Sequence, residues 1–289
     1  MQSLRAAALL FVFVVVTLCL IPYQAAALRF ERPRRKTFPQ RYHRFLCRLF
    51  GIRIRVIGTS VQNQGVLMVV NHTSWLDILV LSAAARVSFV AKAEVQSWPF
   101  FSTLARLQET VFVDRVRRSQ TGEARDHIRE RLRAGDALVL FPEGTSSDGN
   151  KVLPFKSALM GAAEAELGIG AAGQMRHVPV QPVSVAYVGV HGIPMGREFR
   201  PLFAWYGDME LVPHLWEALK TGPIEVVVEF HNPLTVDSVG GRKALAALSE
   251  ATIRRAQAQA LAGLAPVPAP PVQAEAEAEP GVDLAEAVA

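Results

Sequence analysis

A histidine and an aspartate separated by four residues form the first pair in this sequence whose types and spacing suit acid–base chemistry. His72 follows an apolar run, and Asp77 lies five residues on in the segment NHTSWLD, where a helical pattern begins. A neutral imidazole can take a proton from a hydroxyl group when a carboxylate holds its other ring nitrogen. The bend from loop to helix can bring the two side chains together. Taken alone, however, this spacing more often marks a helix-capping turn with a structural histidine.

Three further segments come at or just after apolar runs that we predict to be strands. In LVLFPEGTSSDG a strand runs into Glu143-Gly144-Thr145, where exposed backbone amides can hold an anion. In TVFVDR a strand ends at Arg115, and an arginine binds phosphate through two parallel hydrogen bonds. The segment HVPVQPVSV is typical of a core strand with edge prolines. Because open α/β sheets bind ligands at the carboxyl ends of their strands, we expect these segments to meet.

The signatures of several other enzyme classes are absent from the sequence. It contains no Gly-x-Ser-x-Gly elbow, which argues against a serine hydrolase, and no Gly-Lys-Ser/Thr phosphate loop, which argues against a nucleotide hydrolase. Two cysteines, Cys19 and Cys47, are too few for a disulfide scaffold or a cysteine zinc cluster. No spacing of histidine and carboxylate side chains predicts a metal site. We therefore expect no metal and no cofactor.

The elements that must position these residues alternate between strand and helix along the chain. This alternation predicts an α/β fold with a mostly parallel central sheet flanked by helices over residues 56–263. The predicted strands are 53–57, 66–70, 88–91, 111–114, 137–141, 178–185 and 224–230, and the predicted helices are 74–85, 98–107, 119–133, 157–167 and 239–262. Residues 264–289 are rich in Ala, Pro and Glu, which predicts a disordered tail.

The N-terminal segment predicts a membrane anchor. Residues 6–21 are uncharged, and the apolar stretch extends to residue 28, so a helix here is about 24 to 35 Å long against a hydrocarbon core of about 30 Å. One arginine precedes it, whereas ten Lys or Arg and one acid lie in residues 29–55. This order favours an uncleaved helix over residues 1–28, single-pass or peripheral, with the following domain on the cytoplasmic face of the inner or plasma membrane. The alternative is a cleaved signal sequence ending near Ala25-Ala26-Ala27.

Residues 29–55 form a basic collar next to this apolar segment. Residues 56–263 carry no net charge, so the positive charge of the chain is local to the collar. A local basic block beside an apolar helix favours anionic lipid headgroups as its partner. Nucleic acid is the weaker interpretation, because no aromatic stacking positions are interleaved with the basic residues in a recognisable module.

Taken together, the four segments resemble the glycerolipid acyltransferase family, the 1-acyl-sn-glycerol-3-phosphate O-acyltransferases. NHTSWLD is similar to its His-x4-Asp block, VFVDR to its arginine block, FPEGTSSDG to its Glu-Gly-Thr block and VPVQPVSV to its proline block. The resemblance covers residues 56–233. It implies transfer of a fatty acyl group from a thioester of coenzyme A or acyl carrier protein to the hydroxyl of a lysolipid in the membrane.

The resemblance also implies roles for single residues. By position, His72 would be the general base and Asp77 its orienting partner, and Arg115 would contact the acceptor headgroup. The acceptor side would be lined by Glu143, Gly144, Thr145 and Ser146.

Ser146 departs from the family pattern, which continues with Arg or Lys after the Glu-Gly-Thr block. We expect lysophosphatidic acid as the acceptor, giving phosphatidic acid in phospholipid biosynthesis, with Lys151 or Lys156 supplying the missing cation. The alternative is an acceptor without a phosphate, such as lyso-ornithine lipid, with Asp148 available to pair with its amine. A catalytically inactive, membrane-anchored lipid-binding protein is a third possibility, although such a copy would be expected to lose the His72/Asp77 pair.

Overall fold

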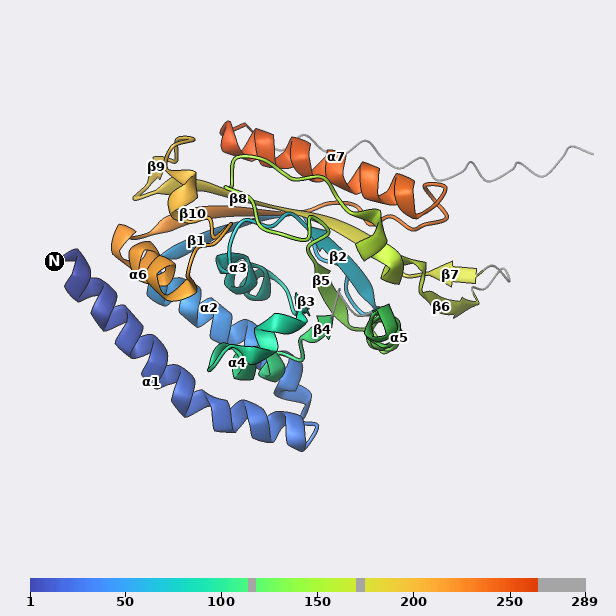
Figure 1. Cartoon of the computed structure of the whole chain (residues 1–289), viewed down its shortest axis with the longest axis horizontal. Coiled ribbons are helices and arrows are strands. Elements are labelled where there is room, and N and C mark those ends of the chain that lie inside the picture. Colours follow the sequence, from blue (N-terminus) through green and yellow to red (C-terminus); the bar gives the residue numbers. More distant parts are fainter. Residues whose placement is uncertain (114–117, 170–174, 265–289) are drawn as a thin grey trace, which may run out of the picture.

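The computed structural model describes residues 1–113, 118–169 and 175–264, and it forms one large sheet with helices on both faces (Figure 1). The strand order is β1-β10-β8-β2-β5-β3-β4, with β9 paired to β8. All neighbours along this order are parallel except β10 and β8. The prediction of an α/β fold with a mostly parallel sheet is therefore confirmed.

The strands follow the short apolar runs of the sequence. Their bounds are β1 Ile52–Ile57, β2 Val66–Val70, β3 Ser88–Lys92, β4 Val111–Val113, β5 Ala137–Leu140, β8 Val180–Val190, β9 Ile193–Pro194 and β10 Ile224–Phe230. All five residues of β2 are buried, because the strand lies in the middle of the sheet with helices over both faces. Such a strand reads as a continuous apolar run rather than an alternating one.

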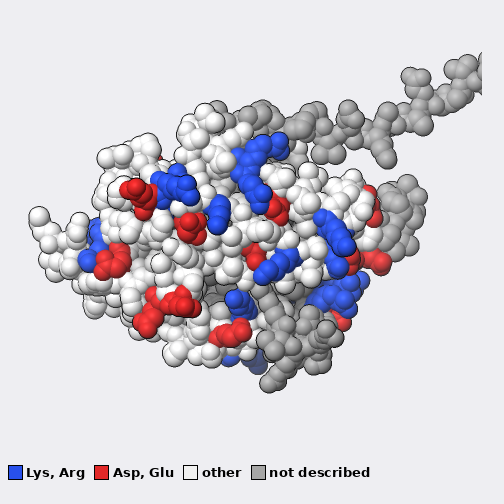
Figure 2. All heavy atoms as spheres, turned by 45° about the horizontal axis from the view of Figure 1, so that its top comes forward, with Lys and Arg blue, Asp and Glu red and all other residues white. Residues whose placement is uncertain are grey.

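Two hydrophobic cores separate the sheet from its helices. The larger core lies between the sheet and the helices α1 Gln2–Arg29, α2 Phe38–Phe50, α3 Leu76–Ala84 and α6 Leu211–Thr221, and Phe100, just before α4 Phe101–Leu107, packs against it. The smaller core lies on the other face, under α5 Arg118–Arg133 and α7 Arg242–Leu261. Charges of both signs are interspersed over the face that carries α7 (Figure 2).

One predicted helix takes a different form in the structure. The helix expected over 157–167 is a 3-10 helix, η3 Ser157–Glu164, followed by β6 Glu166–Ile169, which pairs with β7 Met175–His177. Gly161 lowers helix propensity in the middle of the segment, and Gly168 has a φ of 123°, which no helix accommodates. The region 264–289, predicted to be a disordered tail, lies outside the described residues apart from its first residue.

Helix α1 packs along the domain with one face. Thr17 Oγ1 lies 2.6 Å from the Tyr42 hydroxyl of α2, and Gln24 Nε2 donates to the carbonyls of Arg35 and Leu107 at 2.9 and 3.0 Å. The opposite face exposes large apolar side chains, among them Leu4, Phe11, Val15 and Leu18. By length and composition, α1 is able to cross a membrane. The helix is therefore both a part of the domain and an apolar outer surface.

The basic collar is a folded part of the domain. It holds a 3-10 turn, η1 Pro33–Lys36, the helix α2 and the start of β1. Lys36 Nζ bonds Asp136 Oδ1 at 2.5 Å, and Arg131 bonds the other carboxylate oxygen. Burial would raise the pKa of Asp136, but these two cations outweigh it and lower that pKa. Lys36 is thus held in an ion pair within the protein, and Arg44 donates from Nε to the carbonyl of Ala83 at 2.9 Å, whereas Arg41 and Arg48 lie on the exposed side of α2.

We predict that a chain lacking residues 1–28 binds anionic vesicles at low salt and dissociates as salt is raised. Each exposed Lys or Arg near such a surface contributes about 1 kcal/mol, and salt screens that contribution. Vesicle flotation measures the bound fraction. The full chain, which keeps the apolar helix, should float at every salt concentration, and changing Arg41, Arg44 and Arg48 to Gln in the shortened chain should weaken its binding. Salt-independent flotation of the shortened chain would contradict this prediction.

Candidate active site

The proposed general base and its partner lie at the carboxyl end of β2. Asn71 directly follows the strand, and its side-chain amide exchanges two hydrogen bonds with the backbone of Val185 in β8, at 2.8 and 2.9 Å. These two hydrogen bonds fix the position of the chain just before His72. His72 Nδ1 lies 2.8 Å from Asp77 Oδ2. The predicted contact between the two side chains is confirmed.

Asp77 is fully buried, and its carboxylate organises the loop before α3. Oδ2 also accepts hydrogen bonds from the backbone amides of Thr73 and Ser74, at 2.8 and 3.0 Å. The helix predicted over 74–85 begins at Leu76 instead, and no side chain caps its N-terminus. The arrangement is the reverse of a cap, because the carboxylate in the first turn binds the amides that precede the helix.

The His72 ring lies between this carboxylate and a large cavity. One face of the ring stacks on Phe141, with centroids 4.0 Å apart and an interplanar angle of 20°. The side chain is 20% exposed and lines the cavity. With one nitrogen held by Asp77, the ring is oriented to exchange a proton through the other nitrogen.

Glu143 has a different place from the one we expected. Its side chain is 2% exposed, and its two carboxyl oxygens accept hydrogen bonds from the backbone amides of His72 and Leu153, at 2.8 and 3.0 Å. Burial raises the pKa of Glu143 to about 8, the two amides oppose that rise, and the charges of Asp77 and Glu250 add to it. Glu143 does not line the cavity. The expectation that it lines the acceptor side is corrected: the side chain holds the His72 loop.

The other three residues expected on the acceptor side, Gly144, Thr145 and Ser146, do line the cavity beside His72. The Ser146 hydroxyl donates to the carbonyl of Trp205, so a neutral group engaged with another loop lies where the family pattern has a cation. Arg115 lies outside the described residues, so its contact with an acceptor remains a prediction.

Lys92 is a cavity-lining cation that sequence reasoning missed. It is the last residue of β3 and therefore lies at the same edge of the sheet as His72. Glu94 lines the cavity with it, whereas Lys151 and Lys156 do not. Of the lysines and arginines that the structure describes, Lys92 alone lines the cavity. Its position at the end of a short parallel strand was the signal that could have identified it.

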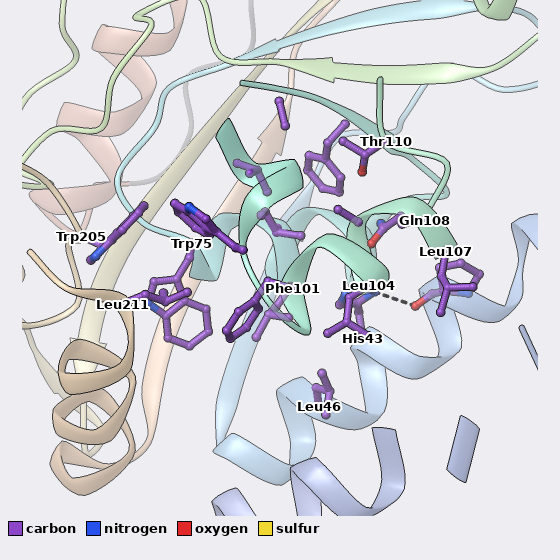
Figure 3. A pocket seen from close by; sticks show the side chains of 18 of the residues that line it. His43, Leu46, Trp75, Phe101, Leu104, Leu107, Gln108, Thr110, Trp205 and Leu211 are labelled. Carbon is purple, nitrogen blue, oxygen red and sulfur yellow. Dashed lines mark hydrogen bonds between the residues drawn. The ribbon is translucent and has the colours of Figure 1, made fainter. Parts of the chain in front are cut away.

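The cavity has a volume of about 420 Å³ and is mainly apolar. Trp75 and Trp205 lie on one side of it, and His43, Leu104 and Leu107 lie on another (Figure 3). Helix α1 contributes part of the wall through Phe13, Thr17, Leu20, Ile21 and Gln24. A long apolar chain fits such a cavity, with its polar end near His72.

No group of three or more side chains in the described part of the chain is arranged to hold a metal ion. Cys47 is buried, and burial raises the pKa of its thiol to about 12, so it is poorly suited to act as a nucleophile.

Comparison with known proteins decides the family. A model of the acyltransferase family matches residues 53–186. The lyso-ornithine lipid O-acyltransferase of Brucella abortus (strain 2308) is 50% identical over 86% of this chain and 92% of that protein, and the one from Rhizobium meliloti (strain 1021) is 44% identical over 86% and 85%. This chain belongs to the acyltransferase family.

More distant matches agree with this assignment. The 1-acyl-sn-glycerol-3-phosphate acyltransferase of Neisseria gonorrhoeae is 34% identical over 57% of this chain and 59% of that protein. The crystal structure of the 1-acyl-sn-glycerophosphate acyltransferase PlsC from Thermotoga maritima has a TM-score of 0.62 and 24% identity, covering 90% of this chain and 97% of that one. That likeness supports the acyltransferase fold. The resemblance expected from the four segments is therefore confirmed.

If His72 is the general base of this acyltransferase, His72→Ala should lower kcat by about 10²–10⁴-fold, because no group then accepts the proton of the hydroxyl. Asp77→Asn should also lower kcat, because the amide no longer orients the imidazole as the carboxylate does. His127, exposed on α5, provides a matched control, and His127→Ala should leave turnover unchanged. Circular dichroism checks the fold. Near-wild-type turnover in folded His72→Ala protein would remove His72 from this role.

Glu143→Gln should destabilise the His72 loop. Above about pH 8, where the Glu143 carboxyl is ionised, both of its oxygens accept hydrogen bonds, whereas a glutamine has one carbonyl oxygen, so one of the two backbone amides loses its acceptor at a cost of about 1–3 kcal/mol. We expect a lower melting temperature and a lower kcat. Glu250→Gln is the matched control, since Glu250 accepts a hydrogen bond from the Phe155 amide but does not bond the His72 loop. That variant should lose stability with little change in kcat. An equal loss of kcat in both variants would argue against a specific role for Glu143.

Proposed function

We propose that this acyltransferase moves a fatty acyl group from an acyl thioester to the free hydroxyl of lyso-ornithine lipid. The observation that carries the proposal is the pattern of similarity: two lyso-ornithine lipid O-acyltransferases match at 50% and 44% identity over 86% of the chain. The 1-acyl-sn-glycerol-3-phosphate acyltransferase match stands at 34% over 57%. This order favours the alternative acceptor over lysophosphatidic acid, which the sequence motifs alone had placed first.

The charges around the cavity support the same acceptor. A phosphate monoester carries between one and two negative charges at neutral pH and needs matching cations when it is desolvated. Ser146 supplies no cation, and its hydroxyl already donates to Trp205. An ornithine headgroup carries a carboxylate and an ammonium group. Lys92 and Glu94 offer one charge of each sign at the cavity, which suits a zwitterion better than a phosphate monoester.

The proposed reaction needs no covalent enzyme intermediate. His72 takes the proton of the acceptor hydroxyl, and the oxygen attacks the carbonyl carbon of the thioester. The tetrahedral oxyanion collapses, the carbon–sulfur bond breaks, and the thiolate leaves with the proton that His72 received. Asp77 keeps the imidazole oriented throughout. Coenzyme A or acyl carrier protein carries the thioester, and the apolar cavity receives the fatty chain.

We further propose that the enzyme works at the cytoplasmic face of the inner or plasma membrane. The exposed apolar side of α1 and the arginines of α2 support this location, because together they match a bilayer with anionic headgroups.

The acceptor is tested by assaying purified protein with acyl-coenzyme A and acyl carrier protein donors, against lyso-ornithine lipid and lysophosphatidic acid in parallel. We expect a higher kcat/KM with lyso-ornithine lipid. Ser146→Arg should shift the ratio towards lysophosphatidic acid, because it adds the missing cation. Lys151→Ala and Lys156→Ala are controls that should leave the ratio unchanged, since neither residue lines the cavity.

Three results would count against the proposal. A wild-type protein that prefers lysophosphatidic acid would return the acceptor to the original expectation. If Lys151→Ala or Lys156→Ala lowers kcat/KM for lysophosphatidic acid relative to lyso-ornithine lipid, the headgroup binds near that lysine and not in the cavity. A protein that binds both lipids and acylates neither would be the inactive lipid-binding protein.

A further inference from the structure

A tyrosine far from the motifs completes the hydrogen bonding of Asp77. Tyr187 lies on β8, and its side chain is on the same face of the sheet as Val183 and Val185, in the larger core. It is 3% exposed. Its hydroxyl donates to Asp77 Oδ1 at 2.7 Å. The contact joins residues 110 positions apart, and none of the four motifs includes Tyr187.

We propose that Tyr187 is a positioning residue for acyl transfer, which orients the Asp77 carboxylate so that Oδ2 faces His72. The inference rests on the proposed function. Tyr187 does not touch the reacting atoms and would act through Asp77 alone.

The division of donors between the two carboxylate oxygens supports this role. Oδ2 receives three hydrogen bonds, from His72 and the amides of Thr73 and Ser74, whereas the structure gives Oδ1 the Tyr187 hydroxyl. A carboxylate can rotate and exchange its oxygens unless both are held. Without Tyr187, Oδ1 would be a buried charged acceptor lacking its donor, which strongly favours rotation or protonation of the group. Either change would weaken the bond that orients His72.

The direction of the hydrogen bond does not change over the working pH range. Burial raises the pKa of Tyr187 well above its usual value, and the charge of Asp77 adds to the rise. The phenol therefore stays protonated and donates. In the described structure no lysine or arginine pairs with Asp77, so the hydroxyl and the two amides are the neutral donors that stabilise its charge.

A double-mutant cycle separates this role from simple core packing. Tyr187→Phe removes only the hydroxyl group. We expect it to lower kcat about tenfold while KM for donor and acceptor stays within about twofold. In the Asp77→Asn background, the same change should lower kcat by less than about twofold, because the carboxylate through which Tyr187 acts is gone.

Ser184→Ala is the matched control. Ser184 is also buried on β8, but its hydroxyl lies 3.3 Å from His231 Nε2, away from Asp77. We expect this variant to keep wild-type kcat in both backgrounds. If Tyr187→Phe does not fold, 3-fluorotyrosine at position 187 replaces it. This residue keeps the hydroxyl but makes it more acidic, and it should change kcat without changing KM.

The outcomes are distinct. Wild-type protein without acyl transfer to any lysolipid would overturn the proposed function, and this inference with it. An active wild type with unchanged kcat in folded Tyr187→Phe would overturn the inference alone. So would an equal loss of kcat in both backgrounds, since that result indicates a packing effect independent of Asp77.

Discussion

One buried negative charge is the constraint around which this site is built. Asp77 lies entirely out of solvent, where an ionised carboxylate is stable only if donors replace its water. Those donors come from the loop that carries His72, from the His72 ring itself and from Tyr187 of β8, the strand next to β2. The path of the chain from the end of β2 into α3 follows from satisfying this one group. The orientation of the catalytic candidate is thus a product of the fold.

A second buried carboxyl group holds the same loop from the opposite side. Glu143 binds the backbone of His72, while Asp77 binds its ring, so the residue is held at two points, by an acid that follows β5 and by an acid in the first turn of α3. Asn71 adds a third attachment, between β2 and β8. These attachments come from α3, from the segment that follows β5 and from β8, so they join the loop to three separate parts of the fold. A rigid base beside an adaptable apolar cavity suits an enzyme whose substrates have long, flexible chains.

The sequence predicted the sheet and the contact between His72 and Asp77 well, because both depend on local signals. The runs 66–70 and 224–230 became strands with those same bounds, since central strands are apolar on both faces. Helix α2 was not predicted, because arginines lie among its apolar positions and the segment was interpreted only as a basic block. Its buried face is formed by Leu46, Cys47 and Phe50. Tyr187 and the inward role of Glu143 depend on contacts between distant segments, which no single stretch of sequence reveals.

The two faces of α1 impose unequal demands on its sequence. On the outward face Phe11, Val15 and Leu18 are exposed, so the shape of an apolar residue there has little effect on packing within the domain. On the inward face, Phe13, Leu20 and Ile21 shape the cavity, so a change of even one methylene alters the space left for a substrate. Substitutions that preserve hydropathy should therefore accumulate freely on one side of the helix. On the other side, the same substitutions would change the shape of the cavity beside His72.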